Sequence, residues 1–196
     1  MRPDEAIYVP WVIWALSWFL AAAWADRTVK RPAIGSQTLY RVIEFSGFGL
    51  LLFYVVRRPP YGQAPFGGAQ LWTLPDAAKW AMVGVATLGF LFCWWARIHL
   101  GRLWSGSVTR KEGHHVVDTG PYAIVRHPIY TGVITAALAT MAVRGTAAAV
   151  LGAALIFIGY VVKGRLEETF LRAELGAEAY DAYARRTAML VPFLKL

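Results

Sequence analysis

The sequence predicts an all-α integral membrane protein with five transmembrane helices. Of its 196 residues, 57% are hydrophobic and only 16% are charged, and the mean hydropathy of +0.43 is too high for a soluble domain of this size. Nine Trp and nine Tyr residues lie mostly near the ends of apolar runs, where amphipathic rings reach the lipid headgroups. Lipid is therefore the solvent that this composition suits.

Five apolar segments supply the predicted helices. They cover residues 8–25, 40–56, 77–96, 128–143 and 147–162. At about 1.5 Å per residue such helices are about 24 to 30 Å long, which suits a hydrocarbon core of about 30 Å. Only residues 144–146 connect the last two segments. These two are therefore expected to form an antiparallel hairpin, in which Gly and Ala residues allow the backbones to approach closely.

The basic residues predict how the chain crosses the membrane. If the N-terminus lies outside, fifteen of the 20 Lys and Arg residues lie on the inner side and five lie on the outer side. Because positively charged connections stay in the cytoplasm, residues 97–127 and the C-terminal tail are expected there together. We therefore predict a multi-pass protein with an external N-terminus and a cytoplasmic C-terminus.

Charge and cysteine content argue against several other classes of protein. The net charge of +8 comes from Lys and Arg residues scattered between apolar segments, a pattern that indicates membrane topology and no nucleic-acid partner. The single cysteine, Cys93, lies inside an apolar segment, which excludes an internal disulfide and argues against a catalytic thiol. The four histidines have no Cys, Asp or Glu at ligand spacing, so no metal site is expected.

A dense polar segment, residues 114–132, leads directly into the fourth apolar segment. Pro128 suits the first turn of a helix and keeps His127 out of helical geometry, so His127 is expected at or near the N-cap. The N–H groups of residues 129–131 would then be free to bind a carboxylate or a phosphate.

Two further features of this segment predict a small pocket for an anion and a ring. A tight turn at Gly120 and Pro121 would bring Tyr122 back over the helix start. Gly132 would leave room beside the helix for a flat group.

A second polar cluster, residues 163–168, stands where the fifth apolar segment ends, and the hairpin returns it beside His127. Glu167 or Glu168 is expected to hold a diol or to accept a proton, since acids at the edge of a bilayer are costly without a partner. Lys163 or Arg165 is a candidate for binding an acidic acceptor. The tail that follows is predicted to be an amphipathic helix lying on the membrane surface or against the bundle.

Three separated motifs together resemble a known family. They are the pattern HxVVxxGPYxxVRHPIYxG starting at His114, the sequence RLEE at residues 165–168, and LGAEAYDAYARR at residues 175–186 ahead of Val191 and Pro192. In this order and spacing they resemble the isoprenylcysteine carboxyl methyltransferase family, which is related to the membrane phospholipid methyltransferases. The resemblance covers residues 97–196.

The resemblance implies that S-adenosylmethionine binds between the loop before the hairpin and the tail after it. Residues 97–196 would then be the cofactor-binding half, and residues 1–96 would form three helices with a lipid-accessible tunnel for the acceptor. The cofactor contacts implied by the family are His114, His115, Val116, Val117, Tyr122, His127, Pro128, Ile129, Tyr130 and Glu167.

The implied reaction is methyl transfer to a lipophilic or membrane-embedded acceptor, with membrane lipids as the other partners. For the carboxylate of a prenylcysteine-like substrate, Lys163 or Arg165 would bind and orient the acceptor, and no base is required. An amine or thiol acceptor would need Glu168 as a base. Where eukaryotic relatives carry an Arg, this chain has Lys163, a point charge in place of a bidentate fork, so isoprenylcysteine is one candidate acceptor among several.

Two other functions remain open at the level of sequence. One is a membrane reductase that uses NADPH, because sterol reductases resemble this family in their C-terminal half; it would need a further basic pocket for the 2′-phosphate. The other is a non-enzymatic membrane subunit that binds lipid or a partner helix.

Overall fold

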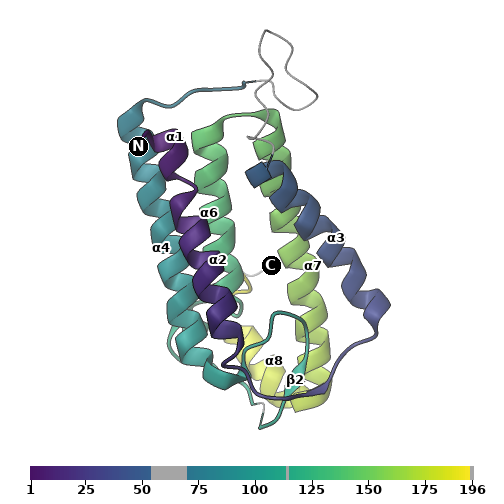
Figure 1. Ribbon diagram of the computed structural model, residues 1–196. Coiled ribbons are helices and arrows are strands. Elements are labelled where there is room, and N and C mark those ends of the chain that lie inside the picture. The colour runs from purple at the N-terminus through teal and green to yellow at the C-terminus, as the bar shows by residue number, and fades with distance from the viewer. Residues whose placement is uncertain (54–69, 114, 195–196) are drawn as a thin grey trace.

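The computed structural model describes residues 1–53, 70–113 and 115–194 (Figure 1). Almost all of the regular structure is helical, with one small antiparallel pairing between β1 and β2. In chain order the elements are α1 (Pro3–Ala6), α2 (Val9–Ala22), β1 (Thr28–Lys30), α3 (Ile34–Phe48) with a π-helical turn η1 (Gly49–Phe53), α4 (Asp76–Leu100) with a 3₁₀ turn η3 (Gly101–Leu103), β2 (Arg110–Lys111), α5 (Pro121–Ile124), α6 (Pro128–Arg144), α7 (Ala147–Leu175) and α8 (Ala177–Arg186).

Among the described residues, three helical stretches are long and apolar enough to cross a membrane, by length and composition. They are Pro3–Ala22, Asp76–Leu103 and Ala147–Leu175, and α6 is a shorter apolar helix. The chain is thus a helical protein with membrane-spanning character, as its composition predicts. The expected span over residues 40–56 ends outside the described residues, and the count of five spans stays a prediction.

The long helices form two groups, one containing α6 and the other α7, and the groups are connected by the α6–α7 hairpin. In one group α2 packs on α4 and α4 packs along α6; in the other α3 packs along α7 (Figure 1). The loop between α4 and α6 and the helix α8 lie at the same end of the molecule, whereas the N-terminus and the α6–α7 turn lie at the opposite end (Figure 1). The loop and the tail therefore share one side, as the charge distribution predicts.

The predicted hairpin between the last two apolar segments is present. Gly145 adopts a left-handed conformation with φ of 58°, and the side chain of Thr146 caps α7 by accepting a hydrogen bond from the N–H of Ala149. Helix α7 then continues well past residue 162 to Leu175. A break at Gly176, with φ of +100°, separates it from α8, so the predicted tail helix is two helices.

Glycines allow the closest approaches between helices. Gly47 of α3 faces the backbone of α7 at Gly152, and Gly132 of α6 faces the backbone of α4 at Gly89. The expectation that Gly132 leaves room for a flat ligand is wrong, because the space beside it is filled by Gly89 and Cys93.

A buried arginine ties the lower ends of α2 and α4 together. The side chain of Arg97 is fully buried and donates to the carbonyl oxygens of Ala21 at 2.8 Å and Trp24 at 3.2 Å, at the C-terminal end of α2. The rings of Trp24 and Trp104 lie 5.0 and 4.7 Å from its guanidinium carbon. A cation at this position satisfies carbonyl groups that a helix end leaves unpaired.

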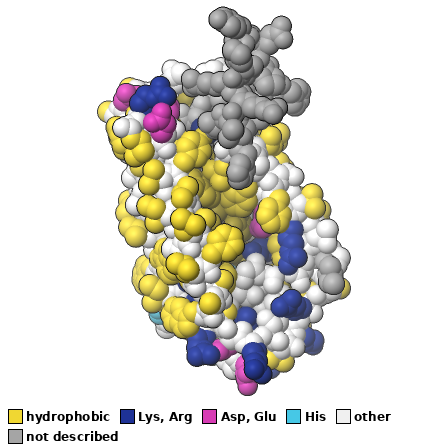
Figure 2. Space-filling model, viewed as in Figure 1, with side chains coloured by type: hydrophobic (Ala, Val, Ile, Leu, Met, Phe, Trp, Pro, Cys, Tyr) yellow, Lys and Arg dark blue, Asp and Glu magenta, His cyan; other side chains and the backbone are white. Residues whose placement is uncertain are grey.

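The outer surface shows where lipid would lie. Hydrophobic side chains gather over α2 and α4, while charged side chains gather at the end that holds α8 and β2 (Figure 2). Phe19 and Leu20 of α2 are 79% and 81% exposed. Large apolar side chains exposed over a whole face are typical of a surface that contacts hydrocarbon.

Replacement of Gly132 tests the contact between α4 and α6. Gly132→Ala places a Cβ against the backbone of Gly89, so we expect the protein to lose about 1 to 3 kcal/mol of stability. Gly84→Ala is the matched control, because no atom lies within 4 Å of its added Cβ; it should gain about 0.5 to 1 kcal/mol. Thermal unfolding in detergent measures both, and equal midpoints for the two variants would contradict this packing.

Candidate functional site

The start of α6 has the geometry that its sequence predicts. His127 is the N-cap and Pro128 occupies the first helical position. Among the described residues, none accepts a hydrogen bond from the backbone N–H of Ile129 or Tyr130. The N–H of Thr131 bonds to the carbonyl of His127 at 3.0 Å, so two of the three expected donors remain available to a ligand.

The C-terminal tail lies alongside this helix start. Val125 and Ala188 form a parallel bridge, and the N–H groups of Arg126 and His127 donate to the carbonyl oxygens of Ala188 and Met189 at 2.8 and 3.1 Å. The tail segment thus fixes the backbone that carries the N-cap. Sequence periodicity offers no signal for such a pairing, since it involves two short irregular segments.

A partly buried ion pair connects the helix start with α7. The guanidinium of Arg126 donates to both carboxylate oxygens of Glu168, at 2.7 and 3.1 Å, and also to the carbonyl oxygen of Ala184 at 3.1 Å. The Arg126 side chain is 9% exposed. The ring of His127 lies 3.0 Å from the same carboxylate through Nε2. Glu168 is therefore fully occupied by residues of the chain itself.

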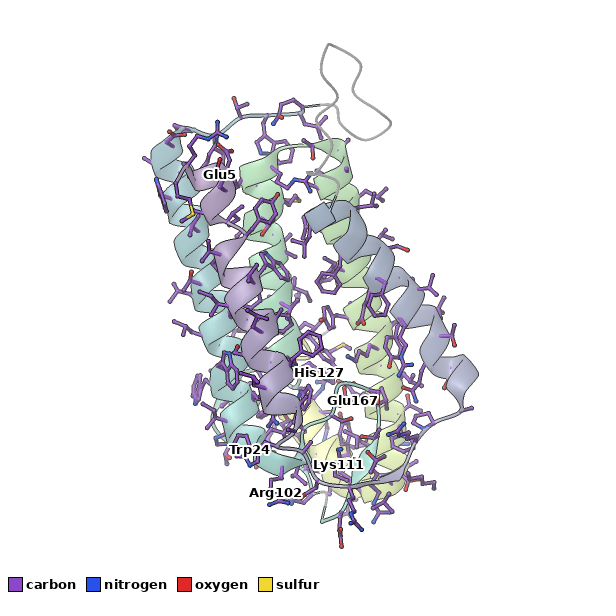
Figure 3. The ribbon with its side chains drawn as sticks, in the orientation of Figure 1. Glu5, Trp24, Arg102, Lys111, His127 and Glu167 are labelled. Atoms are coloured by element: carbon purple, nitrogen blue, oxygen red, sulfur yellow. The ribbon has the colours of Figure 1, made fainter. Side chains whose placement is uncertain are left out.

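Glu167 occupies a different position from its neighbour. Its carboxylate accepts a hydrogen bond from the Tyr130 hydroxyl at 2.6 Å and lies 3.7 Å from His127 Nδ1. The His127 ring stacks on Tyr130 at 5.0 Å with an interplanar angle of 3°, and Tyr130 in turn stacks on Tyr160 at 4.7 Å. Figure 3 shows His127 and Glu167 close together, near the start of α6 and in the lower half of α7.

A cavity opens over this cluster. It has about 780 Å³ of space, which includes space open to solvent. Nine of the ten predicted cofactor residues line it: His115, Val116, Val117, Tyr122, His127, Pro128, Ile129, Tyr130 and Glu167. The tenth, His114, lies outside the described residues.

The cavity also has walls that were not predicted from the sequence. They include Leu171 and Leu175, which follow Glu167 at steps of four residues on the same face of α7, and Tyr180 and Tyr183 of α8. The helical spacing of residues 167, 171 and 175 is the signal that would have found the first two. Trp104 and its neighbours come from the loop after α4.

Tyr122 reaches the cavity as the turn at Gly120 predicts. Gly120 has φ of +56°, and a Cβ at this position would meet the ring of His99. The hydroxyl of Tyr183 donates to the carbonyl oxygen of Tyr122 at 2.8 Å. Burial raises the pKa of both tyrosines well above its ordinary value, so both hydroxyls stay neutral.

The three residues predicted to act on the acceptor, Lys163, Arg165 and Glu168, point to different surroundings from α7. Lys163 lines a second cavity of about 630 Å³, which adjoins the first because Trp104, Ser105, Ile129 and Tyr130 line both. Arg165 is exposed, and neither Arg165 nor Glu168 lines either of these two cavities. The structure thus brings Lys163, but not Arg165 or Glu168, to the second cavity.

Loss of the partly buried ion pair tests how the site is held. Arg126→Met leaves the partly buried carboxylate of Glu168 with His127 as its remaining partner, so we expect a loss of about 1 to 3 kcal/mol of stability and faster proteolysis of the tail. Arg186→Met is the control, because the ion pair of Arg186 with Asp118 is exposed and should contribute no more than about 1 kcal/mol. Equal effects of the two substitutions on thermal unfolding would show that the partly buried pair does not hold the tail.

Comparison with known proteins gives one family and two relatives. The chain is 32% identical over 122 residues to the nickel-cobalt-cadmium resistance protein NccN of Alcaligenes xylosoxydans xylosoxydans, covering 60% of this chain and 54% of that protein. It is 30% identical over 122 residues to the cobalt-zinc-cadmium resistance protein CzcN of Cupriavidus metallidurans, covering 60% and 53%. The chain spans about half the length of these relatives.

The family match falls on the elements that build the site. It begins within α4, includes the loop and the start of α6, and ends near the C-terminal end of α7. Arg126, His127, Glu167 and Glu168 all lie within it, whereas α8 lies beyond it. Residues 82–173 match the isoprenylcysteine carboxyl methyltransferase (ICMT) family, which confirms the resemblance drawn from the first two sequence motifs; the third motif, at residues 175–186, lies beyond the match.

Proposed function

We propose that this chain is an S-adenosylmethionine-dependent methyltransferase that acts on a lipophilic or membrane-embedded acceptor. The observation that carries the proposal is the cavity over the start of α6, since nine residues implied as cofactor contacts line it and most of its wall lies in the family-matched segment. We further propose that the site faces the cytoplasm and that the N-terminus is outside.

The chemistry of the cavity fits this cofactor. The unpaired N–H groups of Ile129 and Tyr130 at a helix N-terminus suit a carboxylate. The Glu167 oxygen that Tyr130 does not bind is available to a ribose diol. The stacked rings of His127 and Tyr130 and the nearby Tyr122 supply aromatic surface for a flat base.

When bound, S-adenosylmethionine supplies a methyl group already activated by a sulfonium, so the protein has little covalent chemistry to perform. The chain's own residues then bind, orient and exclude water. Trp104, Ile129 and Tyr130, which both cavities share, stand between the cofactor space and the space lined by Lys163. We propose that the acceptor occupies the second cavity and meets the cofactor at this shared wall.

The placement of Glu168 favours a positioning role over the base predicted from sequence. Its two oxygens hold Arg126 and His127, and it lines neither cavity. Arg165 is exposed outside both cavities, so Lys163 becomes the cationic candidate for contact with the acceptor.

Binding of S-adenosylhomocysteine to the purified protein, measured by calorimetry, tests the cofactor assignment. Glu167→Gln replaces a charged acceptor in the cavity wall with a neutral one, so we expect S-adenosylhomocysteine to bind about tenfold more weakly. His127→Ala removes both the stacking surface and a partner of Glu168, and should weaken binding at least as much. Glu178→Gln, on the exposed face of α8, is the control and should bind like wild type. Absence of binding, or equal binding by all three variants, would refute the proposal.

The same titration separates the methyltransferase from the two alternatives. We expect NADPH to bind more weakly than S-adenosylhomocysteine; tighter binding of NADPH would favour the reductase. A non-enzymatic subunit would show no turnover against a broad acceptor panel and would co-purify with another protein.

The names of the two relatives motivate a second proposal about cellular setting. Both names refer to resistance to cobalt and cadmium. We propose that methylation by this chain contributes to tolerance of these metals. Cells that lack the gene should then grow less well on cobalt or cadmium, and the wild-type chain should restore growth while Glu167→Gln should not. Equal restoration by both chains would separate metal tolerance from cofactor binding.

A further inference from the structure

The second cavity lies between the two groups of helices. Its walls come from α2, α3, α6 and α7 and from the loop after α4. Most of the wall is aromatic, including Trp14, Trp18, Phe45 and Phe48. Two charged side chains, Glu44 and Lys163, stand in this apolar surround. Charges in such a setting are costly and usually serve a ligand.

Glu44 lines the cavity, and one of its carboxylate oxygens has no partner among the described residues. Its Oε1 atom is buried, and no hydrogen-bond partner lies near it among the described residues. The side chain is held in place by α7, because Gly159 allows its Cγ and backbone to approach closely. A buried carboxylate oxygen without a hydrogen-bond donor costs free energy, which a ligand that supplies a donor would recover.

Lys163 presents the opposite charge without satisfying Glu44. Its ammonium lies 4.9, 5.5 and 5.6 Å from the ring centres of Tyr130, Tyr40 and Tyr160, and donates to the carbonyl oxygen of Gly106 at 3.2 Å. No ion pair within 4.0 Å joins it to Glu44 in the described part of the chain. The cavity therefore offers a separate donor and a separate acceptor, and their charges cancel.

We infer that the second cavity binds a neutral amphiphile whose head group carries a hydroxyl. A hydroxyl donates its hydrogen to Glu44 and accepts from Lys163 through its lone pairs, while the apolar body packs on the aromatic wall. A carboxylate head is attracted by Lys163 but repelled by Glu44. An ammonium head is attracted by Glu44 but repelled by Lys163. In naming this ligand as the methyl acceptor, the inference rests on the proposed function. The hydroxyl oxygen would form a bond to the methyl carbon while the bond from that carbon to the sulfonium sulfur breaks, and the hydroxyl proton would pass to the carboxylate of Glu44.

Three ligands with the same twelve-carbon chain test this selectivity: dodecan-1-ol, dodecylamine and dodecanoate. Their dissociation constants are measured with the full chain in nanodiscs of a zwitterionic phospholipid, by competition against radiolabelled dodecan-1-ol. We expect wild-type protein to bind the alcohol most tightly. Glu44→Gln keeps the packing against Gly159 but removes the charge, so alcohol binding should weaken about tenfold and dodecanoate binding should strengthen.

Lys163→Gln should shift selectivity the other way, toward dodecylamine, because Glu44 then acts alone. Glu178→Gln is the matched control for a carboxylate lost elsewhere and should keep the wild-type order. Tightest binding of dodecanoate by wild type, or the same order in Glu44→Gln and Glu178→Gln, would overturn the inference. Titration with S-adenosylhomocysteine is run on the same preparations: its failure counts against the proposed function, while a wrong order of the three ligands counts against the acceptor assignment alone.

Discussion

The partly buried ion pair of Arg126 and Glu168 is the contact on which the site depends. It joins the residue before the N-cap of α6 to the end of α7 that leaves the bundle, and Arg126 also holds the carbonyl groups at the end of α8. A bidentate pair in this position sets the distance between His127 and Glu167, which belong to different helices. Because the tail also pairs with residues 125–127 through its backbone, three chain segments meet at one place.

Adjacent glutamates serve different purposes because of this pair. Both oxygens of Glu168 bond to Arg126 and His127, so none is left for a ligand. Glu167 lies about 100° further around the helix, where it lines the cavity and bonds to Tyr130. His127 contacts both, so it couples the structural pair to the ligand wall. Substitution of Glu168 would thus weaken ligand binding by moving His127, whereas substitution of Glu167 would weaken it by removing a direct contact.

The two cavities differ in the kind of ligand that their polar groups suit. The first combines free helix N–H groups, a carboxylate and stacked rings, which together suit a zwitterionic molecule with a flat base. The second is an aromatic space with one acid and one base held apart. Tyr130 stands at their boundary, since its ring covers Lys163 on one side and its hydroxyl reaches Glu167 on the other.

Local features of the sequence determined the helices, the hairpin and the start of α6. The apolar segments and the connection at 144–146 specify helices and a hairpin, and the His127-Pro128 pair specifies a helix start, because these depend on neighbours a few residues apart. Most of the predicted residues that line the first cavity were chosen from the motif and the family that it resembles. Only the tertiary structure decided that Gly132 packs on α4, that Glu168 pairs with Arg126, and that Glu44 and Lys163 line one cavity. Each of these depends on which faces of distant helices meet, and the periodicity of a single segment does not specify its neighbour.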